Sequence, residues 1–168
     1  MTIIDKYFSE FGEGQRPMAA SVESLTFCAN LIESEKVENI LDSGSGLSSA
    51  FFHSKFSNVR TVDHDPYWAN KTSSFISSHV NKHINIDSIL QLTDQRFDFV
   101  FYDYGDMETR IYYFKHALAL CNRFLYVDDM HVNFYNAYVK SRAKKHQLEI
   151  IPETTDQYGR YGALIIKH

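Results

Sequence analysis

The chain has little cysteine and proline and no excess of positive charge. Its 168 residues include two cysteines, Cys28 and Cys121, and neither has a CxxC partner, so neither a zinc site nor a disulfide framework is indicated. The net charge of −4 argues against nucleic acid, because proteins that bind phosphate backbones usually carry a basic surface. No long apolar run indicates a membrane span and no secretory signal is evident, so we expect a cytoplasmic protein.

The remaining composition is that of one folded domain. Hydrophobic residues make up 44% and charged residues 23% of the chain, both typical of a soluble globular protein. Apolar residues recur at three- and four-residue spacing over 19–33, which predicts a helix with one buried face. We expect a single domain over 1–168, with an N-terminal helical lid (1–34) and an α/β core (35–168).

From Val37 onward, short apolar runs alternate with helical segments. The predicted strands are Val37–Asp42, Val59–Asp63, His83–Ile86, Phe97–Asp103, Arg123–Asp128, Leu148–Pro152 and Gly162–Lys167. The predicted helices between them are Leu47–Phe56, one opening at Asp65-Pro66, Thr109–Cys121 and His131–His146. The last two strands lie too close in sequence for a crossover helix, so they must be antiparallel. This order predicts a Rossmann-like, doubly wound, mostly parallel sheet that binds ligands at the carboxyl ends of its strands.

A glycine-containing loop, Asp42-Ser43-Gly44-Ser45-Gly46, links the first strand to its helix. Glycine lets the backbone turn tightly and lets a ligand approach closely, although an ordinary turn would explain a GxG equally well. The neighbouring carboxylate of Asp42 is more informative, because it would repel the pyrophosphate of a dinucleotide. It would attract the ammonium and sulfonium groups of S-adenosylmethionine.

A second cofactor signal is Asp63, at the end of the second strand and about twenty residues after the glycine loop. An acid there is placed to accept hydrogen bonds from both ribose hydroxyls, although a surface turn would also accommodate it. Asp65 is expected to cap the following helix, with Pro66 in the first helical position.

Four segments, ILDSGSGLSSAFF, VRTVDHDPYW, RFDFVFYDYGD and FLYVDDMH, together resemble the class I S-adenosylmethionine-dependent methyltransferase family over residues 14–168. The resemblance implies a seven-stranded sheet with an antiparallel final strand. It also implies that the methionine end of the cofactor is lined by Asp42, Gly44, Ser45 and Gly46, and that Asp63 holds the ribose. The residues expected near the adenine are His64, Asp87 and Ser88, and Asp103 is a further expected cofactor contact. Ser48 stands where the family usually has a third glycine, which leaves room for a tilted cofactor.

Three further acids follow adjacent predicted strands: Asp103 after one, and Asp128 and Asp129 after the next. Side by side these carboxylates would repel one another, and Mg²⁺ or Ca²⁺ would neutralise them. The arrangement is similar to the metal-dependent catechol-type O-methyltransferases, with Asp129 where that subfamily has an amide and no lysine after Asp103. The alternative is that the acids hold the cofactor's amine or cap a helix.

The candidate catalytic residues are therefore Asp103, Asp128 and His131. His131 would act as a general base, and the alternative is that it is an ordinary surface histidine. The loop over 105–109 is short, so either the substrate is a small molecule or a second subunit of a homodimer completes the site. The sequence predicts methyl transfer from S-adenosylmethionine to a small molecule, at a hydroxyl oxygen. The alternatives are a dinucleotide-binding oxidoreductase and a non-catalytic subunit that binds S-adenosylmethionine.

Overall fold

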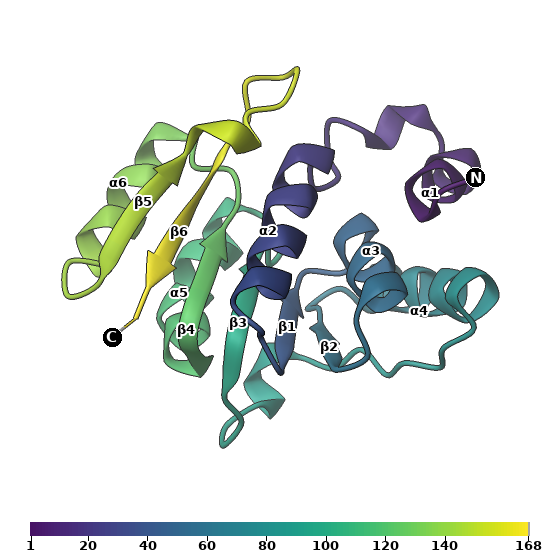
Figure 1. Ribbon diagram of the computed structural model, residues 1–168, viewed down its shortest axis with the longest axis horizontal. Coiled ribbons are helices and arrows are strands. Elements are labelled where there is room, and N and C mark those ends of the chain that lie inside the picture. Colours follow the sequence, from purple (N-terminus) through teal and green to yellow (C-terminus); the bar gives the residue numbers. More distant parts are fainter. Residues whose placement is uncertain (168) are drawn as a thin grey trace.

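A computed structural model describes residues 1–167 as a six-stranded sheet between two layers of helices (Figure 1). The helices are α1 (Ile3–Phe11), α2 (Val22–Ser34), α3 (Leu47–Lys55), α4 (Pro66–Val80), α5 (Met107–Leu120) and α6 (Asn133–Arg142), with 3-10 turns η1 (Glu13–Gln15), η2 (Ile89–Gln91) and η3 (Pro152–Thr154). The strands are β1 (Ile40–Ser43), β2 (Val59–Val62), β3 (Phe97–Tyr102), β4 (Cys121–Val127), β5 (Gln147–Ile151) and β6 (Gly162–Ile166). Among the described residues, no helix is long and apolar enough to cross a bilayer.

The strand order is β2-β1-β3-β4-β6-β5. β1 pairs in parallel with β2 and β3, and β3 pairs in parallel with β4. β6 pairs antiparallel with both β4 and β5, which confirms the predicted terminal hairpin. The Rossmann-like, mostly parallel α/β class is thus confirmed.

The predicted count of seven strands is wrong, because the segment 83–86 does not form a strand. On the side of β2 that faces away from β1, the described chain forms one isolated parallel bridge, between Val62 and Asp87. At this bridge the Asp63 amide donates to the Asp87 carbonyl at 2.9 Å. Directly after this bridge, Ser88 caps η2 and the chain turns away from the sheet. One bridge is too short to extend the sheet, which therefore ends at β2.

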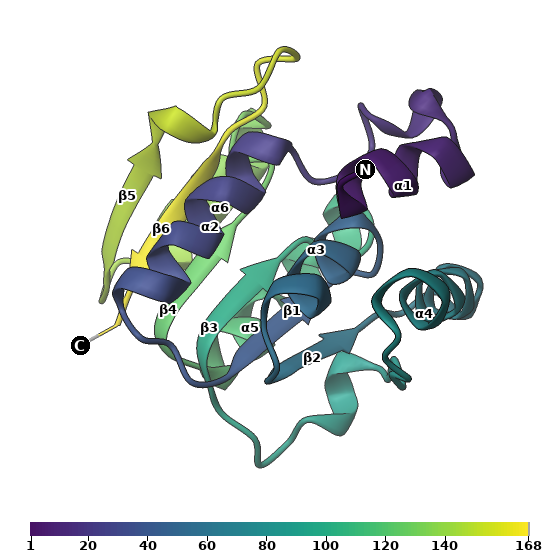
Figure 2. The ribbon, with the colours of Figure 1, turned by 45° about the vertical axis from the view of Figure 1, so that its right-hand side comes forward.

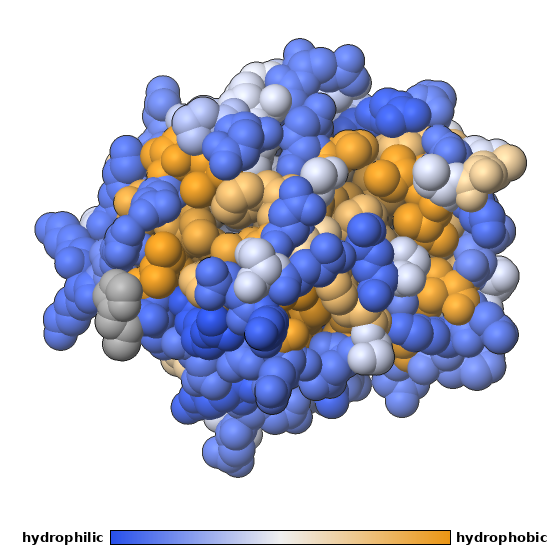
Figure 3. Space-filling model, viewed as in Figure 1, coloured by the Kyte–Doolittle hydropathy of each residue, from blue (hydrophilic) through white to orange (hydrophobic). Residues whose placement is uncertain are grey.

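The two faces of the sheet bury separate apolar layers. Along β3, Phe99 and Phe101 pack in the layer with α1 to α4, whereas Val100 and Tyr102 pack in the layer with α5 and α6. Figure 2 shows α2 and α3 in front of the sheet and α5 behind it. On the face drawn in Figure 3, apolar residues gather on both sides of α2.

The helix that follows β2 begins as predicted, because the Asp65 carboxylate accepts from the Tyr67 amide at 2.9 Å and Pro66 occupies the first turn. Two other helices begin elsewhere. α5 begins at Met107, two residues earlier than expected, because Asp106 caps it by accepting from the Thr109 amide at 2.8 Å. α6 begins at Asn133 with no side-chain cap from the described residues, so the Asp129 carboxylate is available for other contacts.

Candidate functional site

A cavity of about 500 Å³ opens at the carboxyl ends of the parallel strands. Its walls come from α1, from the segment between η1 and α2, and from the loops that follow β1, β2 and β3. The charged side chains in the lining include four aspartates and one arginine, namely Asp63, Asp65, Asp103, Asp106 and Arg110. The cavity is therefore acidic, and it suits a cationic ligand better than one that carries phosphates.

The glycine loop is one wall of this cavity, formed by Gly44, Ser45 and Gly46. Gly44 adopts φ 106°, and a Cβ atom there would overlap the carbonyl oxygen of Asp103. Only glycine lets the β1 loop approach the end of β3 so closely. The sequence predicted a close approach of a ligand to this glycine. In the structure, Gly44 also lets the loop after β1 contact the backbone at the end of β3.

Asp42 lies beneath the loop and is fully buried, so its carboxylate does not form the cavity wall that the resemblance implied. It accepts from the hydroxyls of Ser49 and Thr61, the latter at 3.2 Å, while its Oδ1 has no hydrogen-bond partner within residues 1–167. Burial raises the pKa of Asp42 to about 7, against the opposing effect of the Ser49 and Thr61 hydroxyls. Asp42 thus supports the loop from below.

Asp63 lines the cavity beside the glycine loop, where the sequence placed it. Its Oδ2 accepts from the Ser45 amide at 2.6 Å and from the Ser45 hydroxyl, and its Oδ1 accepts from the Asp65 amide at 2.8 Å. These donors fix the carboxylate: Oδ2 accepts two hydrogen bonds and Oδ1 accepts one, with the His64 Nδ1 3.2 Å from Oδ1. Asp63 is therefore a carboxylate of fixed orientation in the cavity wall.

The residues expected at the adenine separate into two groups. His64 lines the cavity and lies against the Tyr104 ring, with ring centroids 5.4 Å apart. Asp87 and Ser88 lie outside the lining: the Asp87 carboxylate pairs with Arg60, and Ser88 caps η2. The side chains of Asp87 and Ser88 are therefore bonded to other residues, and neither lines the cavity in which the adenine was expected.

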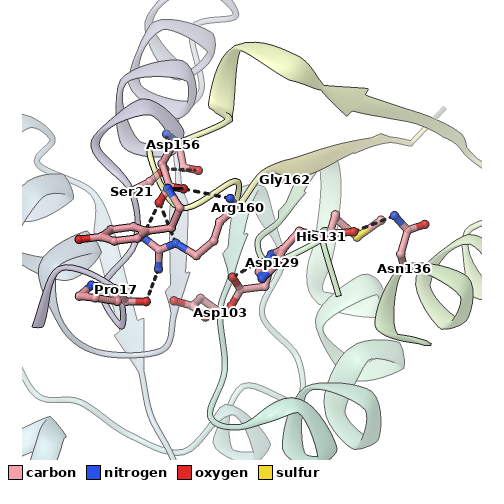
Figure 4. A network of polar contacts seen from close by, with 12 residues as sticks. Pro17, Ser21, Asp103, Asp129, His131, Asn136, Asp156, Arg160 and Gly162 are labelled. Atoms are coloured by element: carbon pink, nitrogen blue, oxygen red, sulfur yellow. Dashed lines mark hydrogen bonds and ion pairs between the residues drawn. The ribbon is translucent and has the colours of Figure 1, made fainter. Parts of the chain in front are cut away.

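At the opposite end of the cavity, Asp103 follows β3 and Asp129 follows β4. Arg110 of α5 lies between them: its Nη1 contacts Asp129 Oδ2 at 2.7 Å, its Nη2 contacts Asp103 Oδ1, and its Nε donates to the Gly105 carbonyl at 3.0 Å. Figure 4 shows Asp103 and Asp129 next to each other. Burial raises the pKa of Asp103 well above its ordinary value, and the Arg110 charge opposes that shift.

Asp128 and His131 lie away from the cavity lining. Asp128 is buried, and burial together with the neighbouring Asp129 charge raises its pKa to about 6. The His131 Nδ1 lies 3.5 Å from Asp129 Oδ1, and about a third of the His131 side chain is exposed (33%). Neither residue lines the cavity, so no contact in the structure supports their predicted catalytic roles, which stay predictions.

The proposed metal ligands Asp103, Asp128 and Asp129 do not fit a divalent ion in this structure. The Arg110 guanidinium contacts one oxygen of Asp103 and one of Asp129, so a positive group already lies between the two carboxylates that the ion would bridge. Within residues 1–167, no group of three or more His, Cys, Asp or Glu side chains has a metal-binding arrangement. Sequence reasoning placed the three acids at one edge correctly but missed the arginine between them.

The second arginine that the sequence did not reveal is Arg160, in the loop between η3 and β6. Its guanidinium donates to the carbonyls of Arg16, Pro17 and Ala19 at 3.2, 2.7 and 3.0 Å, and it pairs with Asp156 (Figure 4). The neighbouring residues Met18 and Ala19 line the cavity. Arg160 therefore fixes the N-terminal wall from a segment about 140 residues away in sequence.

No family model and no curated protein sequence matches this chain. Solved structures do match it, and they define its fold class as the Rossmann-like methyltransferase fold. The chain superposes on an O-methyltransferase from Bacillus cereus in complex with SAH with a TM-score of 0.75 and 17% identity, over 98% of this chain and 90% of that one.

Two further neighbours show how widely this fold is used. Magnesium protoporphyrin IX methyltransferase from Synechocystis PCC 6803, with bound SAM, matches with a TM-score of 0.65 and 13% identity, over 99% and 96% of the two chains. An rRNA methylase from Streptococcus thermophilus matches with a TM-score of 0.61 and 16% identity, over 88% and 99%. At such identities the similarity establishes the fold, and the activity has to be inferred from the site.

Proposed function

We propose that this chain is an S-adenosylmethionine-dependent methyltransferase that acts on a hydroxyl oxygen of a small molecule. The observation that carries the proposal is the Asp63 carboxylate, fixed by Ser45 and Asp65 beside a glycine loop in an acidic cavity. The fold shared with methyltransferases of known structure supports it.

The chain's own residues fit this cofactor. Asp63 would accept from the ribose hydroxyls, through Oδ1 and, once the Ser45 hydroxyl turns to the ligand, through Oδ2. The loop over 44–46 would contact the methionine end through its backbone, and His64 would lie near the adenine. The acidic lining would attract the ammonium and sulfonium charges and repel a pyrophosphate. When bound, the cofactor supplies an electrophilic methyl group on its sulfonium.

Asp103 is the proposed proton acceptor. It lines the cavity at the end opposite the ribose site, and its carboxylate is held by Arg110. A hydroxyl that attacks a methyl group must lose its proton, and a carboxylate whose pKa is raised by burial is a better base than an exposed one. Asp128 and His131 would act through Asp129, since His131 Nδ1 lies 3.5 Å from Asp129 Oδ1 and Asp128 precedes Asp129 in the chain.

Substrate size is limited by the walls. Tyr7, Met18 and Trp68 are apolar or aromatic residues of the lining. Such walls favour a small, partly apolar molecule that carries a hydroxyl group. The acidic lining argues against an RNA acceptor, although an rRNA methylase shares the fold.

The experiment is a turnover assay with methyl-labelled S-adenosylmethionine against phenols, catechols, hydroxy acids and an RNA oligonucleotide. The proposal predicts labelled product and S-adenosylhomocysteine with at least one small hydroxylated acceptor. Binding of S-adenosylhomocysteine without turnover of any acceptor would favour a non-catalytic subunit. Labelled RNA in place of labelled small molecules would overturn the substrate class.

A further inference from the structure

Within the described lining of the cavity, Arg110 is the one arginine. It lies in the second turn of α5, four residues after the capping Asp106. Side chains on a helix lean toward its N-terminus, and here that direction leads to the carboxyl edge of the sheet. Its side chain is 10% exposed, so the guanidinium is almost fully enclosed and still touches the cavity.

Three of the five N–H groups of this guanidinium have identified partners, which come from the loops after β3 and after β4. Nη1 contacts Asp129 after β4, Nη2 contacts Asp103 after β3, and Nε donates to the Gly105 carbonyl. A planar donor group with partners in three directions cannot turn without breaking at least one contact. Arg110 therefore has a fixed place between the two carboxylates.

The same two carboxylates are the ones that a divalent ion would need. A hard cation binds carboxylate oxygens at roughly 2.0–2.6 Å, so an ion that bridged Asp103 Oδ1 and Asp129 Oδ2 would have to sit where the guanidinium nitrogens now lie. Displacing Arg110 would leave a buried guanidinium without its partners, which is strongly unfavourable. A metal ion and Arg110 cannot both neutralise Asp103 and Asp129.

We propose that the Arg110 guanidinium is a built-in cation that takes the place of a divalent metal ion at the β3–β4 edge and positions Asp103 for proton transfer. The role of Asp103 in this statement rests on the proposed function. The exclusion of a divalent ion depends only on the contacts of Arg110, so the two parts can fail separately. Arg110 acts through Asp103 and is a positioning residue.

The first test is calorimetric titration of the intact protein with Mg²⁺ and with Ca²⁺. The wild type and R110K, which keeps the positive charge, are expected to bind neither ion. R110S removes the cation and leaves the carboxylates facing one another, so it is expected to gain binding of at least one of the two ions. D129N in the R110S background is the control and is expected to lose that binding.

Binding of one equivalent of Mg²⁺ or Ca²⁺ by the wild type that D129N abolishes would overturn the exclusion of a metal. A folded R110S, shown by circular dichroism, that binds no ion would overturn the other half of the proposal, that Arg110 takes the place of the ion. If R110S does not fold, the wild-type and R110K titrations still decide the question, since binding by either contradicts it.

The second test separates positioning from general stability. R110K keeps the charge but cannot contact Asp103 and Asp129 together, so kcat is expected to fall by about 10- to 100-fold, the value of one charge-assisted hydrogen bond. The KM for S-adenosylmethionine should change by less than about threefold, because the ribose site is untouched. An unchanged kcat in R110K would refute the positioning role.

A control on the wild type distinguishes this inference from the proposed function. Titration with S-adenosylhomocysteine tests the cofactor site, and the metal titrations do not depend on its outcome. Failure to bind S-adenosylhomocysteine would defeat the methyltransferase proposal and leave the built-in cation standing. Wild-type turnover that a chelator abolishes and Mg²⁺ restores would defeat the built-in cation and leave the methyltransferase proposal standing.

Discussion

The two ends of the cavity are built in different ways. The ribose end is local, because Gly44, Ser45, Asp63 and Asp65 lie within about twenty residues and the Ser45 and Asp65 amides both donate to the Asp63 carboxylate. The opposite end joins the ends of two strands to a helix, through Asp103, Arg110 and Asp129. The first can be recognised from spacing along the chain, whereas the second depends on how a helix packs against the sheet.

The difference also concerns charge. At the ribose end, neutral amides and a hydroxyl hold a carboxylate, which keeps its negative charge for a ligand. At the other end, a guanidinium offsets buried carboxylates that would otherwise repel one another. One end is therefore suited to recognition and the other to proton transfer, and the predictions below test that division.

The largest effect is expected from D103N, which removes the proposed proton acceptor. Turnover should fall by about 10²- to 10⁴-fold, the usual contribution of a general base, while the affinity for S-adenosylhomocysteine stays within about threefold of the wild type. D106N is the matched control: Asp106 also lines the cavity, and asparagine caps a helix equally well. Equal losses in both variants would contradict the assignment.

The next effect is expected from G44A, which tests the contact that joins the two ends. The added Cβ would overlap the Asp103 carbonyl, and φ 106° is strained for alanine, so the free energy of unfolding should fall by about 2–4 kcal/mol. G159A has a similarly positive φ of 73° with open space around it, and should lose only about 1 kcal/mol. Urea unfolding measures both. If the two variants lose the same stability, the close approach of the loop to β3 is unimportant.

A smaller effect, confined to the ribose end, is expected from D63N. The neutral amide loses charge-assisted hydrogen bonds to the ribose, so the Kd for S-adenosylhomocysteine should rise by about 10- to 100-fold. D65N keeps the helix cap and should change the Kd by less than about threefold. Calorimetry on both variants gives the comparison, and similar affinities would remove Asp63 from the ribose site.

D42N tests the support beneath the glycine loop through pH. The folded-state pKa of Asp42 is about 7, above its ordinary value of 3.8, so the folded state holds this proton more tightly than the unfolded chain. Its contribution to stability is complete below about pH 4 and is lost as the pH rises through 7. Between pH 5 and 8 the wild type should lose about 2–3 kcal/mol more than D42N in urea unfolding. Parallel pH profiles would show that Asp42 does not titrate in this way.

The smallest effect is expected from R160A, which releases the N-terminal wall. The lost hydrogen bonds to the carbonyls of Arg16, Pro17 and Ala19 should weaken S-adenosylhomocysteine binding by about 3- to 10-fold, with kcat little changed. R142A, which removes an exposed arginine over the Tyr138 ring, is the control and should leave the Kd unaltered. A Kd for R160A equal to that of R142A would mean that the wall holds without Arg160.

The sequence predicted what local chemistry determines. Spacing identified the glycine loop, Asp63 and the helix cap at Asp65, and the short connection before β6 identified the terminal hairpin. The predictions from sequence were wrong where contacts between segments far apart in the chain determine the structure. The segment 83–86 has strand character but meets β2 at one bridge, and Asp42 points under its loop rather than into the cavity.

Arg110 shows why the β3–β4 end could not be predicted fully. With α5 expected to begin at Thr109, Arg110 lay at the helix end with no defined direction. Recognising Asp106 as the cap would have placed Arg110 one turn inside the helix, leaning back toward the aspartates. Arg160 gave no such signal, because its partners are backbone carbonyls of a distant segment.

Calorimetry of the wild-type protein with S-adenosylhomocysteine and with NAD⁺ is the most direct test of the central claim, that this acidic cavity holds a phosphate-free adenosyl cofactor. We expect saturable, one-to-one binding of S-adenosylhomocysteine that D63N weakens, and no measurable binding of NAD⁺. Binding of NAD⁺ with no response to S-adenosylhomocysteine would contradict the account.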